Sequence, residues 1–287
     1  MKIVMTNYQN AKALEGLTLG KTTDYASEYN SNLLQGVPRS LNREQLNLTN
    51  QNLPFHGEDV WYGYELSWLN DKGKPIVAVA EFRVPATSEN IVESKSFKLY
   101  LNSFNQSRFK SREDVLERLT SDLSNTAKAP VTVKLFAVDD CPALEINHIE
   151  ATSIDEHDIS VDDYQFDDSI LNNVHAGETE QVEEVLVSHL LKSNCLITNQ
   201  PDWASVYISY QGKKINQQAL LAYLISFRQH NEFHEQCVER IYCDLQKFGS
   251  FDTLSVYARY TRRGGLDINP FRSSQNESAP NGRTLRQ

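Results

Sequence analysis

The sequence ERLTSDL at residues 117–123 recurs in altered form as ERIYCDL at residues 239–245. A second pair of matching stretches precedes these two, with YLNSF at 100–104 and YLISF at 223–227. The order is the same in both halves, and the spacing differs by one residue. An internal repeat of this kind indicates two copies of one structural unit.

Each copy contains helix-period and strand-period segments in the same order. Phe97, Tyr100, Leu101 and Phe104 recur at i, i+3, i+4 and i+7, which places them on one face of a helix. Ser111, followed three residues later by Asp114, predicts the start of a second helix. In the second copy the corresponding helices are predicted at 219–227 and 234–248. Alternation predicts strands at 60–68, 76–84, 131–138, 203–210 and 254–260, whereas 185–191 fits a strand or a helix.

These elements predict an α+β fold of two tandem strand-strand-helix-helix-strand modules, with antiparallel sheets and a helix pair packed on one face of each. The acidic segment between the modules is interpreted as a solvated linker rather than a cation site. The polar C-terminal tail is expected to be frayed. The predicted divisions are an N-terminal arm with little regular structure (1–57), the first module (58–144), the acidic linker (145–178), the second module (179–271) and the tail (272–287).

Composition restricts the class of protein. The net charge of -10 over 287 residues argues against a broad nucleic-acid surface. No apolar run is long enough to span a membrane, and the N-terminus lacks the pattern of a signal peptide. The four cysteines form no CxxC pair, which favours free thiols in a reducing compartment. We therefore expect a cytoplasmic protein that does not associate with a membrane.

The two copies of the repeat differ at positions whose side chains could take part in a reaction. Cys195 and Asp202 stand at the two ends of a short loop between two strand-like segments of the second copy, whereas the first copy has NDKGK at 70–74 and no cysteine. A thiol and a carboxylic acid across one turn suit a nucleophile and a proton donor. The alternative is an ordinary buried cysteine, because Leu196 and Ile197 follow it.

The first copy carries ESKS at 93–96 immediately before its first helix, where the second copy has the uncharged NQQA at 216–219. A helix N-terminus favours anions, and Lys95 and Lys98 add positive charge. The alternative is a capped helix with solvated lysines. A site that draws on both copies is the economical hypothesis.

Two further segments of the second copy carry polar groups. FHE at 233–235 opens a helix, and Glu235, like Glu93, suits the N–H donors of a heterocycle or the cap of a helix. His230 and His234 have a spacing known from zinc sites, but the general-base glutamate is missing and no metal site is predicted. RRGG at 262–265 suits a phosphate or a solvated turn, and the absence of GxGxxG argues against a Rossmann fold.

Together these segments resemble a known family. ESKSFKLY at 93–100, SNC at 193–195 with PDW at 201–203, and FHE at 233–235 are similar, in order, to motifs of the QueF family of nitrile reductases, in the tunnelling-fold superfamily. The chain resembles the two-module form over nearly its whole length. The resemblance implies reduction of 7-cyano-7-deazaguanine to 7-aminomethyl-7-deazaguanine by two NADPH, in the pathway to the queuosine of tRNA.

The resemblance also implies a role for each matching residue. The Cys195 thiolate would add to the nitrile carbon to give a covalent thioimide, Asp202 would donate the proton, and His234 would lie near the reacting carbon as a third catalytic residue that assists proton transfer. No metal is required. The implied substrate-binding residues are Glu93, Ser94, Lys95, His234 and Glu235, and the implied NADPH-binding residues are Lys95, Ser96, Arg263 and Gly264.

Two alternatives remain at this point. One is a tunnelling-fold enzyme of the cyclohydrolase type that acts on a pterin-like substrate with zinc, for which the sequence lacks the His and Cys ligands. The other is a non-catalytic module that holds a purine-like ligand, against which the Cys195 and Asp202 pair argues. We expect a small-molecule substrate, no direct tRNA binding and a homodimer at least, since tunnelling folds assemble their sheets into barrels.

Overall fold

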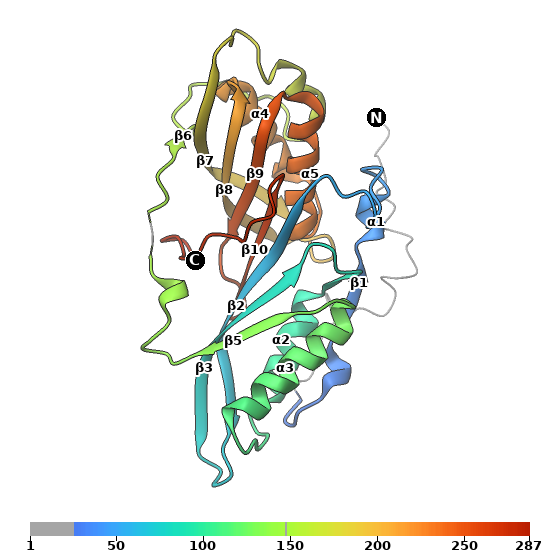
Figure 1. Cartoon of the computed structure of the whole chain (residues 1–287), viewed down its shortest axis with the longest axis vertical. Helices are drawn as coiled ribbons and strands as arrows, with labels where there is room; N and C mark the ends of the chain where they lie inside the picture. Colours follow the sequence, from blue (N-terminus) through green and yellow to red (C-terminus); the bar gives the residue numbers. More distant parts are fainter. Residues whose placement is uncertain (1–25, 147) are drawn as a thin grey trace. The chain divides into compact units, whose positions relative to one another are not determined.

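The computed structural model describes residues 26–146 and 148–287 (Figure 1). The first 25 residues of the predicted N-terminal arm lie outside the described residues. The chain divides into two compact units. Among the described residues, the first unit comprises 26–53, Tyr62–Cys141 and Gly264–Leu266, and the second comprises Pro54–Trp61, 142–146, 148–263 and Asp267–Gln287.

The first unit places a helix pair against three strands. The strands β2 (His56–Leu69, in this unit from Tyr62), β3 (Pro75–Pro85) and β5 (Thr132–Phe136) lie in the order β5-β3-β2, and β3 pairs antiparallel with β5. The helices are α2 (Ser94–Ser103) and α3 (Arg112–Ala127). The predicted start of α3 is confirmed, because the Ser111 hydroxyl accepts from the Asp114 N–H at 3.1 Å.

The N-terminal part of this unit is more regular than the sequence indicates. It contains η3 (Ser31–Leu33), β1 (Gly36–Pro38) and α1 (Ser40–Arg43), and β1 pairs antiparallel with β4 (Asn90–Val92). Val37 in β1 is fully buried. The expectation of little regular structure is therefore wrong for residues 31–43. Elements of three or four residues are too short to give a periodic pattern.

The second unit has a longer sheet. The strands β6 (Thr152–Ser153), β7 (Gln181–Asn194), β8 (Pro201–Lys213), β9 (Phe251–Tyr260) and β10 (Leu266–Ser273, in this unit from Asp267) lie in the order β10-β9-β8-β7-β6. The register is antiparallel from β7 to β10, and β6 is parallel to β7. The ambiguous segment 185–191 is part of a strand. The predicted α+β fold with antiparallel sheets is thus confirmed.

Strand β10 is the longest element that the sequence does not predict. Its eight residues, LDINPFRS, are all buried, and they mix apolar, charged and proline residues without alternation. Its polar side chains can be buried because they pair with residues that are distant in sequence. The Arg272 guanidinium, for example, forms ion pairs with Asp59 at 2.8 Å and Glu239 at 2.9 Å.

The helices α4 (Gln217–Ser226) and α5 (His234–Phe248) pack on one face of this sheet, where Figure 1 shows them in orange beside β8 and β9. Cys237, Ile241 and Leu245 form the buried stripe of α5 that the spacing predicts. Val206 on β8 and Val256 on β9 are fully buried and alternate with residues on the other face. The short helices η4 (Pro142–Leu144), η5 (Asp168–Asn173) and η6 (Phe227–Gln229) lie in the connections.

The same side-chain contacts join the helix pair in each unit. The Tyr100 hydroxyl donates to the Asp122 carboxylate at 2.7 Å, and the Tyr223 hydroxyl donates to Asp244 at the same distance. Ser103 and Ser226 each donate to the carbonyl of the tyrosine three residues earlier. These residues occupy equivalent positions in the repeated sequences. The internal repeat of the sequence therefore corresponds to equivalent side-chain contacts in the two units.

The acidic segment is more than a solvated linker. Phe166 lies against the rings of Tyr223 and Phe227, with the centroid of the Phe227 ring 5.0 Å away. The Asp155 carboxylate accepts from the Ser188 hydroxyl and the His189 N–H at 2.7 and 2.8 Å. Part of the segment therefore packs on the second unit, which its many carboxylates do not indicate.

The C-terminal tail, expected to be frayed, closes a buried polar cluster. Arg259, which is 2 % exposed, donates from Nε to the Gln287 side-chain oxygen at 2.9 Å. The Gln287 amide nitrogen donates to the Tyr260 carbonyl at 3.1 Å and to the Asn269 side chain at 2.6 Å. A polar composition alone does not reveal these partners.

Replacement of Gln287 by alanine is expected to destabilise the protein by about 2–3 kcal/mol. The buried polar groups of Arg259, Tyr260 and Asn269 would each lose a hydrogen-bond partner, and the Arg259 group is charged. The measurement is the free energy of unfolding in urea. Leu285→Ala is the matched control, since Leu285 is 83% exposed and its loss should have little effect. Equal stability of the two variants would contradict this description of the tail.

Candidate active site

The turn between β7 and β8 brings Cys195 and Asp202 to one end of the second unit's sheet. Strand β7 ends at Asn194, and Asp202 pairs with Ser193 across the two strands. The Cys195 N–H donates to the Gln200 carbonyl at 2.8 Å, and the Asn199 N–H donates to the Cys195 carbonyl at 3.0 Å. The predicted loop between two strands is confirmed, and both side chains are buried.

Two basic side chains approach the Asp202 carboxylate. Its Oδ1 lies 2.9 Å from Arg263 Nη1 and 3.6 Å from His234 Nε2. Burial disfavours the ionised carboxylate, but its interactions with His234, Arg263 and Lys192 more than offset this effect and hold the pKa of Asp202 below its usual range. The resting carboxylate is therefore ionised at neutral pH.

Helix α5 supplies the residues beside this carboxylate. His234 is the first residue of the helix, and its ring packs edge-to-face on Tyr260 with centroids 4.0 Å apart. Glu235 follows in the first turn and is 2% exposed. The N-cap residue, Phe233, is also buried. The FHE segment thus opens the helix, as the sequence predicts.

A buried ionic cluster anchors the segment that leads into α5. The Glu232 carboxylate is bound by Arg240, whose Nη2 donates at 2.5 Å, and it lies 3.0 Å from His230 Nε2. Burial disfavours its charge, but Arg240 and His230 lower the pKa of Glu232 to about 2. The Phe166 ring packs on both His230 and Arg240. This segment is therefore firmly held.

In the first unit, the ESKS motif forms the N-terminus of α2. The buried Glu93 side chain caps the helix by accepting from the N–H groups of Lys95 and Ser96 at 2.8 and 2.7 Å. Burial raises the pKa of Glu93, and these hydrogen bonds offset the rise only in part. The Ser96 hydroxyl donates to the Glu93 carbonyl and accepts from the Gln35 N–H. Helix capping, one of the two roles considered for Glu93, is thus present.

The residues implied for NADPH differ in how well they fit a phosphate. Gly264 has a φ of 64°. A Cβ at this position would lie 3.1 Å from the Lys98 ammonium, so the backbone of Gly264 lies next to a positive charge. This arrangement fits a phosphate oxygen. Lys95 and Ser94 are partly exposed at the start of α2. Ser96 fits less well, because its hydroxyl and its N–H are already bonded within the unit.

The structure thus brings Asp202, His234 and Arg263 into contact in the second unit, with Cys195 at the adjoining turn and Glu235 at the start of α5. Glu93, Ser94, Lys95, Ser96 and Gly264 belong to the first unit. The sequence does not single out Lys192, whose ammonium donates to the Asn194 side chain at 2.6 Å and to the Arg228 carbonyl at 2.7 Å. Nor does it single out Asn231, which binds the Cys195 carbonyl. Lys192 and Asn231 each contribute through hydrogen bonds that produce no recognisable pattern in the sequence.

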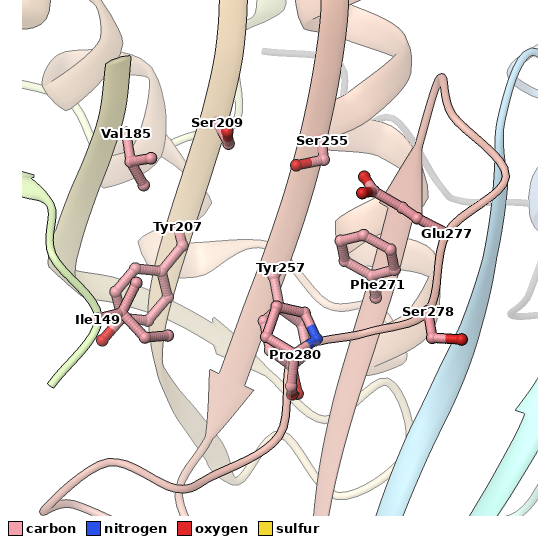
Figure 2. Close-up of a pocket in the computed structure, with 10 residues that line it drawn as sticks. All are labelled: Ile149, Val185, Tyr207, Ser209, Ser255, Tyr257, Phe271, Glu277, Ser278 and Pro280. Atoms are coloured by element: carbon pink, nitrogen blue, oxygen red, sulfur yellow. The ribbon is translucent and has the colours of Figure 1, made fainter. Parts of the chain in front are cut away.

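A separate cavity of about 240 Å³ lies in the second unit, and it contains none of the predicted site residues. Figure 2 shows that it lies over β8, β9 and β10, with Tyr207, Tyr257 and Phe271 on these strands and Pro280 from the tail. Tyr207 and Tyr257 alternate along their strands with the residues under α5, so the cavity is on the face opposite the helices.

The structure describes residues 26–146 and 148–287. Within this described part of the chain, no cluster of three or more His, Cys, Asp or Glu is arranged to hold a metal ion. None of the described helices is long and apolar enough to span a membrane.

Comparison with known proteins identifies the family of the chain. Residues 25–135 match the model of the N-terminal part of the nitrile reductase 7-cyano-7-deazaguanine reductase, QueF_N, and residues 201–279 match the model of QueF-like proteins. The chain is 67% identical over 286 residues to the NADPH-dependent 7-cyano-7-deazaguanine reductase of Colwellia psychrerythraea strain 34H, covering 99% of this chain and 100% of that protein. The chain therefore belongs to the QueF family of nitrile reductases.

Proposed function

We propose that this protein reduces 7-cyano-7-deazaguanine to 7-aminomethyl-7-deazaguanine with two NADPH, in the biosynthesis of queuosine. The observation that carries the proposal is the location of a buried cysteine, Cys195, and an ionised Asp202 at the same β7–β8 turn, with Asp202 held by His234 and Arg263. The activity named for the 67% identical relative supports it. A nitrile carbon is an electrophile that a cysteine thiolate can attack.

The charge of Asp202 suggests how the proton moves. An ionised carboxylate at rest can accept the proton of the Cys195 thiol as sulfur attacks the nitrile carbon. The same carboxyl then donates that proton to the nitrile nitrogen, so that S–H adds across the triple bond and a thioimide results. Asp202 is thus both base and acid within one step, and His234 and Arg263 hold it in place.

The substrate's guanine-like edge carries N–H donors, which suit carboxylates. Glu235 is buried at the start of α5, one residue after His234, and is assigned to this edge. Glu93 is assigned to it as well, with Ser94 and Lys95 beside it. Each carboxylate oxygen has two acceptor sites, so a carboxylate that caps a helix keeps acceptor capacity.

When bound, NADPH supplies the two hydrides that carry the thioimide to the amine. Gly264 and Arg263, in the β9–β10 turn, and Lys95 at the start of α2 are assigned to its phosphates. The Lys98 ammonium beside Gly264 adds positive charge. Ser96 is retained as a support of this helix start, where its hydroxyl holds Glu93.

We also propose the domain organisation, the oligomeric state and the location of the protein. The two units are copies of one tunnelling-fold module, as the equivalent Tyr100–Asp122 and Tyr223–Asp244 contacts support. The N-terminal arm (1–57), the acidic segment (145–178) and the tail (272–287) flank the modules 58–144 and 179–271. We expect a homodimer in the cytoplasm with no direct tRNA binding, which light scattering of the purified protein and a tRNA gel-shift assay would test.

The experiment that tests the proposed function follows NADPH absorbance with and without 7-cyano-7-deazaguanine. The account predicts oxidation of two NADPH for each nitrile consumed and formation of the primary amine, identified by mass spectrometry. No oxidation above the rate without nitrile would overturn the proposal.

Glu235→Leu is expected to weaken substrate binding by about 1–3 kcal/mol, because substrate N–H donors would then be buried without an acceptor. Binding is measured by calorimetry in a Cys195→Ala background, which separates recognition from the covalent step. Gln246→Leu, on an exposed position of the same helix, serves as the control. Affinity equal to that of the control would remove Glu235 from the recognition site.

A further inference from the structure

The catalytic turn is held from outside by one side chain, Asn231. The Asn231 amide nitrogen donates to the Cys195 carbonyl at 3.1 Å and to the Asn199 side-chain oxygen at 2.9 Å. The Cys195 carbonyl also accepts from the Asn199 N–H inside the turn. The peptide group that follows the cysteine is therefore fixed from two directions.

Asn231 is itself fixed by its neighbours. The Asn194 N–H donates to the His230 carbonyl at 2.8 Å, and the Glu232 N–H donates to the Asn194 carbonyl at 3.1 Å. These bonds form a short parallel bridge between Asn194 and Asn231. The Glu232 carboxylate is anchored by Arg240 and His230. The Asn231 side chain thus extends from a rigid segment toward the turn.

Asparagine is well matched to this task. Its amide nitrogen carries two hydrogens, and each has an oxygen acceptor, one from Cys195 and one from Asn199. Asp has almost the same shape but, when ionised, only accepts hydrogen bonds. An aspartate at 231 would therefore remove both bonds and place a negative oxygen beside two acceptors.

We propose that Asn231 is a positioning residue for the reaction, which sets the direction of the Cys195 side chain relative to Asp202 and to the start of α5. This inference rests on the proposed function, in which Cys195 attacks the nitrile. The segment that carries Asn231 continues directly into Phe233, His234 and Glu235. Asn231 therefore links the nucleophile to the element that holds the substrate edge, and a displacement of about 1 Å at a reacting atom can cost about 100-fold in rate.

The test compares Asn231→Asp with Asn172→Asp, since Asn172 also donates from its amide to a backbone carbonyl, but at an exposed site. Two quantities are measured: the rate of covalent adduct formation at saturating nitrile without NADPH, and the Kd of the nitrile in a Cys195→Ala background. For Asn231→Asp, the adduct rate is expected to fall about 10- to 100-fold. The Kd should change less than about threefold, and Asn172→Asp should change neither.

Asn231→Ala gives the same test without a new charge, and it is used if the aspartate variant does not fold. A folded variant at position 231 that forms the adduct at the wild-type rate would overturn the inference. So would a loss of rate fully explained by weaker nitrile binding, since that would mean Asn231 supports the pocket and not the thiol. Failure of the wild-type protein to form any adduct would instead overturn the proposed function itself.

Discussion

Cys195→Ala is expected to abolish nitrile reduction while the protein stays folded and still binds the nitrile. In the proposed reaction the sulfur of Cys195 forms the new bond, and no other group at the β7–β8 turn is a comparable nucleophile. Loss of a nucleophile that acts together with its proton carrier costs at least about 1,000-fold in kcat. The measurement is NADPH consumption with 7-cyano-7-deazaguanine, beside calorimetry of nitrile binding.

Cys243→Ala is the matched control. Cys243 lies on α5, and burial raises the pKa of its thiol to about 12, so that little thiolate is present at neutral pH. This variant is expected to keep nearly full activity. Activity of Cys195→Ala within about tenfold of wild type would remove Cys195 as the nucleophile.

Asp202→Asn is expected to lower the rate of covalent adduct formation about 100- to 10,000-fold. The amide matches the carboxylate in size but neither accepts the thiol proton nor returns it to the nitrile nitrogen. It also loses the ion pair with Arg263, and the carboxylate beside His234 is replaced by a neutral group. Stopped-flow absorbance at saturating nitrile measures this step without NADPH. An unchanged adduct rate would show that the proton follows another route.

The depressed pKa of Asp202 also predicts how stability depends on pH. Because the folded protein holds this carboxylate ionised more strongly than the unfolded chain does, its contribution is complete above the unfolded pKa, near 3.8, and is lost as pH falls through the lower folded pKa. The difference in unfolding free energy between wild type and Asp202→Asn should therefore be constant near neutral pH and shrink below about pH 3.8. Urea unfolding across this range measures it. A gap that grows toward acid pH would contradict the sign.

Sequence predicts those parts of the fold that repeat or alternate. The helix stripes, the Ser111 cap and the strands beside Cys195 follow from periods and caps that involve residues near in sequence. The proximity of Cys195 and Asp202 was predictable because one short turn joins them. The ESKS motif was predictable as a helix start for the same reason.

The parts of the fold and of the site that the sequence does not predict depend on contacts between residues far apart in the chain. Strand β10 pairs its buried charges with Asp59 and Glu239, so no alternation marks it as a strand. Asn231 acts on Cys195 from 36 residues away, through one amide group. Arg263 appears in sequence only as part of a basic turn, whereas in the folded unit it fixes the charge of Asp202. Side-chain pairing of this kind is set by the fold and leaves no local signal.

The central claim is covalent catalysis by Cys195, and its most direct test is the intact mass of the wild-type protein after incubation with 7-cyano-7-deazaguanine in the absence of NADPH. The account predicts a gain equal to the whole mass of the nitrile, since S–H adds across the triple bond without a leaving group. Peptide mapping should locate it on Cys195, and addition of NADPH should remove it. No mass gain, or a gain located on Cys141, Cys237 or Cys243, would contradict the account.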